Sequence, residues 1–120
     1  MIILNPNTTR EYIHSSQKDL PKEEQNVVTL KHLTVEEESI IMDSLYVKGV
    51  TRPYNQYAKA FEIAVIDISN LKTKDGEAVA FNKEIIESIP RSFRDAVACD
   101  VLKFLERKPE QVKNLQSSPS

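Results

Sequence analysis

An Asp-Gly pair between two short β-like segments is the feature that most constrains the fold of this chain. Asp75-Gly76 supplies the positive backbone φ angles that a tight two-residue turn requires, and segments of strand-like composition flank it. We therefore predict a β-hairpin whose arms are residues 71–74 and 77–81. A hairpin of this kind is a packing and recognition element and carries no catalytic chemistry of its own.

Pro90 divides the region that follows the hairpin. Asn82 is a typical N-cap residue, so a short helical turn is predicted over residues 83–88. Because Pro90 lacks a backbone N–H and disfavours the helical conformation in the residue before it, the chain must bend there. Beyond the bend, apolar residues at four-residue spacing predict a final helix from Pro90 or Arg91 to Glu106.

One strand and two further helices are predicted before the hairpin. Residues 26–33 are rich in valine and leucine, which favours a strand. Thr34 and Glu37 have the spacing of a capping box, so a helix begins there, and Gly49 is predicted to end it. Proline in a first turn starts the next helix, whose apolar stripe comprises Tyr54, Tyr57, Ala58, Phe61, Ala64, Val65 and Ile68. Phe61 of this stripe and Val97 of the last helix are predicted to share one core.

Together these elements predict an α+β fold. A chain of 120 residues has room for one domain and can bury a core without metals or disulfides. We expect a small antiparallel sheet, made of the 26–33 strand and the 71–81 hairpin, packed by three main helices. The domain is expected to span residues 26–108, between an extended or flexible N-terminal arm at 1–25 and a flexible C-terminal tail at 109–120.

Composition narrows the functional classes. The net charge of −2 provides no overall attraction to nucleic acid, and no apolar run approaches the length that spans a bilayer. Cys99 is the only cysteine, so neither an intramolecular disulfide nor a cysteine-built zinc site can form. The N-terminus lacks the pattern of a signal peptide, which favours a cytoplasmic protein. Binding to nucleic acid or to a membrane is therefore not predicted.

No group of residues has the pattern of a catalytic, cofactor or metal site. His14 and His32 lie in no ligand motif, and the adjacent carboxylates of Glu36-Glu37-Glu38 would point in different directions on a helix. With two glycines in the chain, there is no glycine-rich phosphate loop. Tyr54 and Tyr57 lack the interleaved basic residues of a base-stacking surface. We therefore expect a non-enzymatic protein without cofactors.

The order of short motifs in the chain resembles that of small structural-module proteins of tailed bacteriophages. The motifs are an N-terminal arm, a charged segment that leads into a strand, a helix start, the Asp-Gly turn and an Ile-Pro pair. They occupy Thr9–Ile13, Asp19–Gln25, Leu33-Thr34, Asp75–Phe81 and Ile89-Pro90. In this respect the chain is similar to tail assembly chaperone-like proteins.

This resemblance implies a non-enzymatic tail assembly chaperone that binds tail or other phage structural proteins in the host cytoplasm. Such a protein would shield apolar surfaces of tail components and release them as tail contacts form. Two alternatives stay open: a structural virion component at the tail or head–tail junction, and a small regulator that binds a host protein. The expected contact residues, from the arm and from a helix surface, are Tyr12, Ile13, Leu20, Arg52 and Tyr54.

Overall fold

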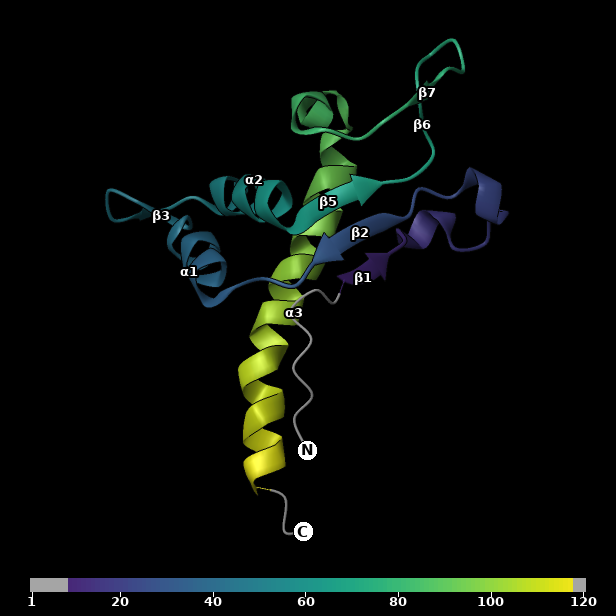
Figure 1. Ribbon diagram of the computed structural model, residues 1–120. Coiled ribbons are helices and arrows are strands. Elements are labelled where there is room, and N and C mark those ends of the chain that lie inside the picture. Colours follow the sequence, from purple (N-terminus) through teal and green to yellow (C-terminus); the bar gives the residue numbers. More distant parts are fainter. Residues whose placement is uncertain (1–8, 118–120) are drawn as a thin grey trace.

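The computed structural model has an α+β fold and describes residues 9–117, with side chains described up to Leu105. Its elements in chain order are β1 (Thr9–Tyr12), η1 (Ser15–Gln17), η2 (Lys22–Glu24), β2 (Val28–Lys31), α1 (Val35–Asp43), β3 (Tyr46–Val47), β4 (Val50–Thr51), α2 (Pro53–Ala64), β5 (Val65–Ile68), β6 (Leu71–Lys72), β7 (Ala78–Val79), η3 (Lys83–Ser88) and α3 (Arg91–Ser117). Figure 1 shows α3 crossing the sheet formed by β1, β2 and β5, with α1 and α2 at one side. The fold class and the three main helices are as predicted.

The core lies where the sheet, α2 and α3 meet. Phe61 of α2 and Val97 of α3 are both fully buried in it, which confirms that these residues share one core. α1 contributes Ile41. The buried apolar residues are Val28, Leu30, Leu33, Ile41, Ala60, Phe61, Ala64, Val65, Ile68, Ile89, Val97, Ala98, Val101 and Leu105.

The sheet has β2 at its centre, and this corrects the predicted strand pairing. β1 runs antiparallel to one edge of β2, with Tyr12 opposite Val28, and β5 runs antiparallel to the other edge, with Ile68 opposite Val28. Because both edges of β2 are occupied, the hairpin cannot pair with the 26–33 strand and forms a separate two-stranded sheet, β6–β7. Buried and half-buried residues alternate along β2, as is typical of a strand with one face on the core: Val28 and Leu30 are buried, and the residues that follow each are half-buried.

Val65 and Ile68 lie in β5, so their predicted place on a helical stripe is wrong. α2 ends at Ala64, and the backbone of Val65 is extended. The run from Val65 to Ile68 contains three β-branched residues, which favour a strand, but the periodicity of so short an apolar run does not separate a helix from a strand. Pairing with β2 decides the outcome, because it buries both Val65 and Ile68.

Part of the predicted N-terminal arm belongs to the folded body. Within residues 9–25, β1 pairs with β2 and Tyr12 packs against the core. The loop that follows is held by the Gln25 amide, whose Nε2 donates to three backbone carbonyl oxygens of the loop. β1 contains few apolar residues. Its strand conformation depends on pairing with β2, which is distant in the sequence, so the local residues do not predict it. The remainder of the predicted arm, residues 1–8, lies outside the described residues.

The capping box predicted at the start of α1 is present. Thr34 Oγ1 accepts from Glu37 N at 3.1 Å, and Glu37 Oε1 accepts from Thr34 N at 2.9 Å. The end of this helix is corrected from Gly49 to Asp43, because a hairpin follows it. Lys48 and Gly49 both have positive φ, 52° and 79°, as a two-residue turn of type I′ requires.

The predicted 71–81 hairpin is present as β6 and β7, with a different turn. The Thr73 N–H donates to the Glu77 carbonyl oxygen at 2.8 Å, so three loop residues lie between them. Of these three, only Gly76 has a positive φ, 84°. A three-residue loop closed by one residue in the left-handed region is a common hairpin connection, so the prediction of a two-residue turn is corrected.

The bend before α3 is confirmed. Asn82 Oδ1 accepts the backbone N–H groups of Glu84 and Ile85 at the start of η3. Ile89, which precedes Pro90, is buried and extended, with φ −80° and ψ 134°. The proline therefore separates η3 from α3 as its chemistry requires.

α3 runs farther than the predicted helix end at Glu106, as far as Ser117. Most of the segment predicted as a tail, 109–120, is therefore helical in backbone conformation, and its last residues, 118–120, lie outside the described residues. Figure 1 shows this end of α3 projecting from the body of the domain.

Candidate protein-binding surface

The five predicted contact residues belong to two separate regions. Tyr12 and Ile13 are half-buried at the end of β1, and Leu20 is 41% exposed in the following loop. Arg52 and Tyr54 are exposed at the start of α2. In Figure 1, β1 lies on one side of α3, and the start of α2 lies on the other. The structure therefore does not bring the five residues together into one site.

Tyr12 is a packing residue of the sheet. Its ring packs against the core, and burial, followed by the nearby Asp100 and Cys99 side chains, raises the pKa of its hydroxyl. The preceding Arg10 ties β1 to α3, because its Nη1 lies 2.6 Å from Asp100 Oδ2. These contacts leave Leu20 as the exposed apolar residue of the first region.

Tyr54 is a surface aromatic that is held in place by its neighbours. The side chain is 63% exposed, yet Arg91 of α3 lies over its ring, 4.3 Å from the ring centre. Tyr57 meets it edge to face, with the ring centres 5.9 Å apart. A rigid, exposed aromatic ring beside a guanidinium group is typical of residues that anchor protein interfaces.

Exposed apolar side chains are concentrated beside Tyr54. Of the ten large hydrophobic residues that are exposed in the described part of the chain, seven lie between Val35 and Tyr54. We use the name hairpin surface for the four that the β3–β4 hairpin and the start of α2 carry, which are Tyr46, Val47, Val50 and Tyr54. Val47 and Val50 lie opposite each other and share one face of the hairpin, whereas Tyr46 points to the other face.

The hairpin surface rests on a fixed frame. The Lys48-Gly49 turn closes the hairpin, Arg52 N donates to the Leu45 carbonyl oxygen at its base, and Asn55 Nδ2 donates to the Ser44 carbonyl oxygen at 2.6 Å. Figure 1 shows the hairpin extending from the body of the domain. Its apolar residues were not predicted as contacts, although Tyr and Val on both sides of a glycine turn are a signal for an exposed hairpin.

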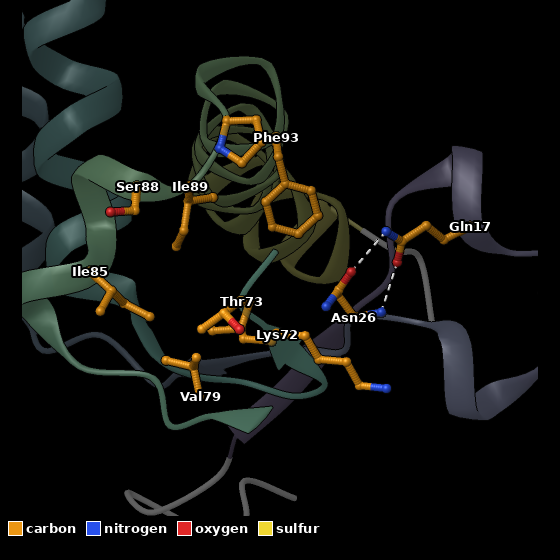
Figure 2. Close-up of a pocket in the computed structure, with 11 residues that line it drawn as sticks. Gln17, Asn26, Lys72, Thr73, Val79, Ile85, Ser88, Ile89 and Phe93 are labelled. Atoms are coloured by element: carbon orange, nitrogen blue, oxygen red, sulfur yellow. Dashed lines mark hydrogen bonds between the residues drawn. The ribbon is translucent and has the colours of Figure 1, made fainter. Parts of the chain in front are cut away.

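A pocket of about 500 Å³ lies elsewhere, between the β6–β7 hairpin, η3 and the start of α3. Figure 2 shows apolar side chains converging on it, with Phe93 and Ile89 on one side and Val79 and Ile85 on the other. The amides of Gln17 and Asn26 form a further wall and hydrogen-bond to each other. Among the described residues, the pocket is lined by Gln17, Asn26, Leu71, Lys72, Thr73, Val79, Ile85, Ser88, Ile89, Pro90 and Phe93.

Titratable groups in the described part of the chain bear on function as possible metal ligands and through shifts in their pKa. No group of three or more His, Cys, Asp or Glu residues there could hold a metal ion. A hydrogen bond from Lys31, followed by one from the Thr34 backbone, lowers the pKa of Glu37 at the start of α1. A hydrogen bond with Cys99 is the largest cause that raises the pKa of Tyr57. Cys99 itself is half-buried, not fully buried.

Comparison of the chain with protein-family models, with curated proteins and with solved structures finds no significant match. Within the described residues, no helix combines the length and the apolar composition needed to cross a membrane.

Proposed function

We propose that this protein is a tail assembly chaperone of a tailed bacteriophage that binds a tail structural protein through the hairpin surface. The observation that carries the proposal is the concentration of exposed apolar side chains between Val35 and Tyr54. The resemblance between the order of motifs in this chain and that of small phage structural-module proteins suggests the class of partner. The proposal therefore joins a physical feature of this fold to a resemblance in sequence.

In the proposed mechanism, the protein binds reversibly to an apolar surface of a tail subunit and shields it from solvent. Val47 and Val50, which lie opposite each other and share one face of the hairpin, would pack on exposed apolar groups of a tail subunit in the host cytoplasm, with Tyr54 as an anchor at the start of α2. Burial of this area is favourable by about 25 cal/mol per Å² of apolar surface before the costs of association are subtracted. A small surface of this kind suits a contact that the growing tail can displace.

Co-expression tests the proposal. The chain is produced with the tail structural proteins of the same phage, captured by an affinity tag, and the bound proteins are identified. We expect a tail protein to be captured, and Val47→Ser with Val50→Ser to reduce its amount severalfold. Ile66→Ser is the matched control, because Ile66 is a similarly exposed β-branched residue, at 48%, on β5. Capture that is equal in all variants would contradict the hairpin surface as the contact.

Composition of purified virions separates the chaperone from its alternatives. A chaperone is absent from the finished particle, so mass spectrometry of purified virions is expected to detect tail proteins and not this chain. Detection of the chain in stoichiometric amounts would show a virion component instead. Capture of a host protein without any tail protein would favour the host regulator. A variant that lacks residues 1–24 is not a suitable test of contacts by the N-terminal segment, because the deletion removes the edge strand β1.

A further inference from the structure

The β6 strand borders the pocket of Figure 2 with its backbone. Three consecutive residues of the chain, Leu71, Lys72 and Thr73, line the pocket. Leu71, Thr73 and Val79 share one face of the hairpin and Lys72 lies on the other, so Lys72 reaches the same cavity only where the cavity extends to the free edge of β6. β7 contributes only Val79, the residue opposite Leu71.

The backbone at this edge is open to a further strand. Thr73 N donates to the Glu77 carbonyl oxygen, and hydrogen-bonded and non-hydrogen-bonded pairs alternate in an antiparallel ladder. The neighbouring pair, Lys72 with Ala78, is therefore of the second kind, so the N–H and C=O of Lys72 point away from β7. In the described part of the chain, β6 pairs with β7 alone.

The pocket carries a positive charge, which Lys72 supplies. Among the described residues that line it, Lys72 is the only charged one. In the same part of the chain, no carboxylate oxygen forms an ion pair with its Nζ. In Figure 2 the Lys72 side chain runs along the rim below Asn26, outside the group of apolar side chains. The side-chain amides of Gln17 and Asn26 are hydrogen-bonded to each other, and Lys72 is the charged group at the pocket that can select a ligand.

We propose that this pocket is a second binding site, which takes an extended segment of a partner protein. The segment adds as a strand to the free edge of β6, places a large apolar side chain between Phe93, Ile89 and Val79, and presents a carboxylate to Lys72. Backbone pairing provides the affinity, and the pocket and the ammonium group provide the selectivity. This site is separate from the hairpin surface and does not depend on the function proposed above.

NMR titration of the whole isotope-labelled protein tests the proposal. The two probes are the acetylated and amidated peptides Ser-Asp-Leu-Val-Ser and Ser-Lys-Leu-Val-Ser. We expect the acidic peptide to shift the Lys72 amide signal and the methyl signals of Val79 and Ile89, and to bind about threefold or more tightly than the basic peptide, as one exposed ion pair allows. Absence of shifts at these residues with both peptides would overturn the proposal.

Charge reversal distinguishes a specific site from general electrostatics. Lys72→Glu is expected to reverse the order of the two peptides. Lys74→Glu is the matched control, because Lys74 is an exposed lysine of the same hairpin that does not line the pocket, and it is expected to preserve the order. An equal effect of both variants would contradict a site at Lys72. Phenylpropionate is a third probe: if it fills the pocket and the peptides do not bind, the pocket takes a small organic acid and the proposed occupant is wrong.

Discussion

Arg10 on the edge strand β1 and Asp100 on α3 form an ion pair across 90 residues of sequence, with Nη1 and Oδ2 2.6 Å apart. The same guanidinium group lies over the ring of Phe104, 4.6 Å from its centre. Arg10 thus attaches a strand that carries few apolar residues to the longest helix of the fold. Together with the pairing of β1 to β2, this attachment accounts for why a segment with the composition of a loose arm is part of the body.

A double-mutant cycle on Arg10 and Asp100 measures this attachment. Both side chains are about one-third exposed, so we expect a coupling free energy of about 0.2–1 kcal/mol, read from chemical denaturation of Arg10→Ala, Asp100→Ala and the double variant. The pair Arg91–Asp95, with an N–O distance of 3.7 Å and a more exposed arginine, is the control and should couple more weakly. Stronger coupling in the control would contradict the role given to Arg10.

Replacement of Phe61 by alanine tests the core. Phe61 is buried between α2 and α3, so Phe61→Ala is expected to lower the free energy of unfolding by about 3–5 kcal/mol. Tyr54→Ala changes an exposed aromatic of the same helix that contacts Arg91 and Tyr57, and it is expected to cost about 1 kcal/mol or less. A loss below about 1 kcal/mol for Phe61→Ala would mean that Phe61 is not a core residue.

Acid should weaken the start of α1. The hydrogen bonds from Lys31 and from the Thr34 backbone lower the pKa of Glu37, so the folded state favours the ionised carboxylate. The resulting stability is fully present above the unfolded pKa of about 4.3 and is lost as the pH falls through the folded pKa. Glu37→Gln is expected to flatten the dependence of unfolding free energy on pH below about 4.3, measured by denaturation at several pH values.

Glu36→Gln provides the control for this pH dependence, because Glu36 is exposed on the same helical turn and lies outside the capping box. Glu36→Gln is expected to retain the acid dependence that Glu37 contributes. Thr34→Ala should lower stability by about 1 kcal/mol through loss of the cap. If Glu37→Gln keeps the full acid dependence, the capping box contributes nothing to it.

Replacing each of the two glycines by alanine tests the backbone conformation of the two hairpin turns. Gly49 and Gly76 have φ values of 79° and 84°, and an added Cβ would meet no atom within 4 Å at either position. Alanine at each should therefore destabilise through backbone conformation alone, by about 1–2 kcal/mol, in thermal or chemical unfolding. Gly49→Ala should also weaken capture of a tail protein, because Gly49 forms the turn of the hairpin surface. A neutral effect of both variants would contradict the left-handed conformations.

Local signals in the sequence predicted local structure well. The Thr34–Glu37 capping box, the Asn82 cap and the bend at Pro90 each depend on residues within a few positions, so residue chemistry is sufficient there. The Lys48-Gly49 turn was missed because lysine rarely adopts a positive φ. Gly49 was instead interpreted as the end of a helix.

Structure that depends on distant partners was not predictable in the same way. Val65 to Ile68 reads equally as helix or strand until β2 is beside it, and Thr9 to Tyr12 becomes a strand through pairing with β2 and through Arg10. The candidate contacts show the same limit. Tyr54 was identified from the sequence, but Val47 and Val50 were not, because their exposure depends on a hairpin that was not predicted.

Hydrogen–deuterium exchange of the captured complex tests the central claim, that the hairpin surface binds a tail structural protein. The exchange rates of backbone amides are compared between the free chain and the chain bound to the captured tail protein. The account predicts slower exchange in the bound form across residues 44–55, with little change at Ile66 on β5. Protection that leaves residues 44–55 unchanged and appears on another face would contradict the account.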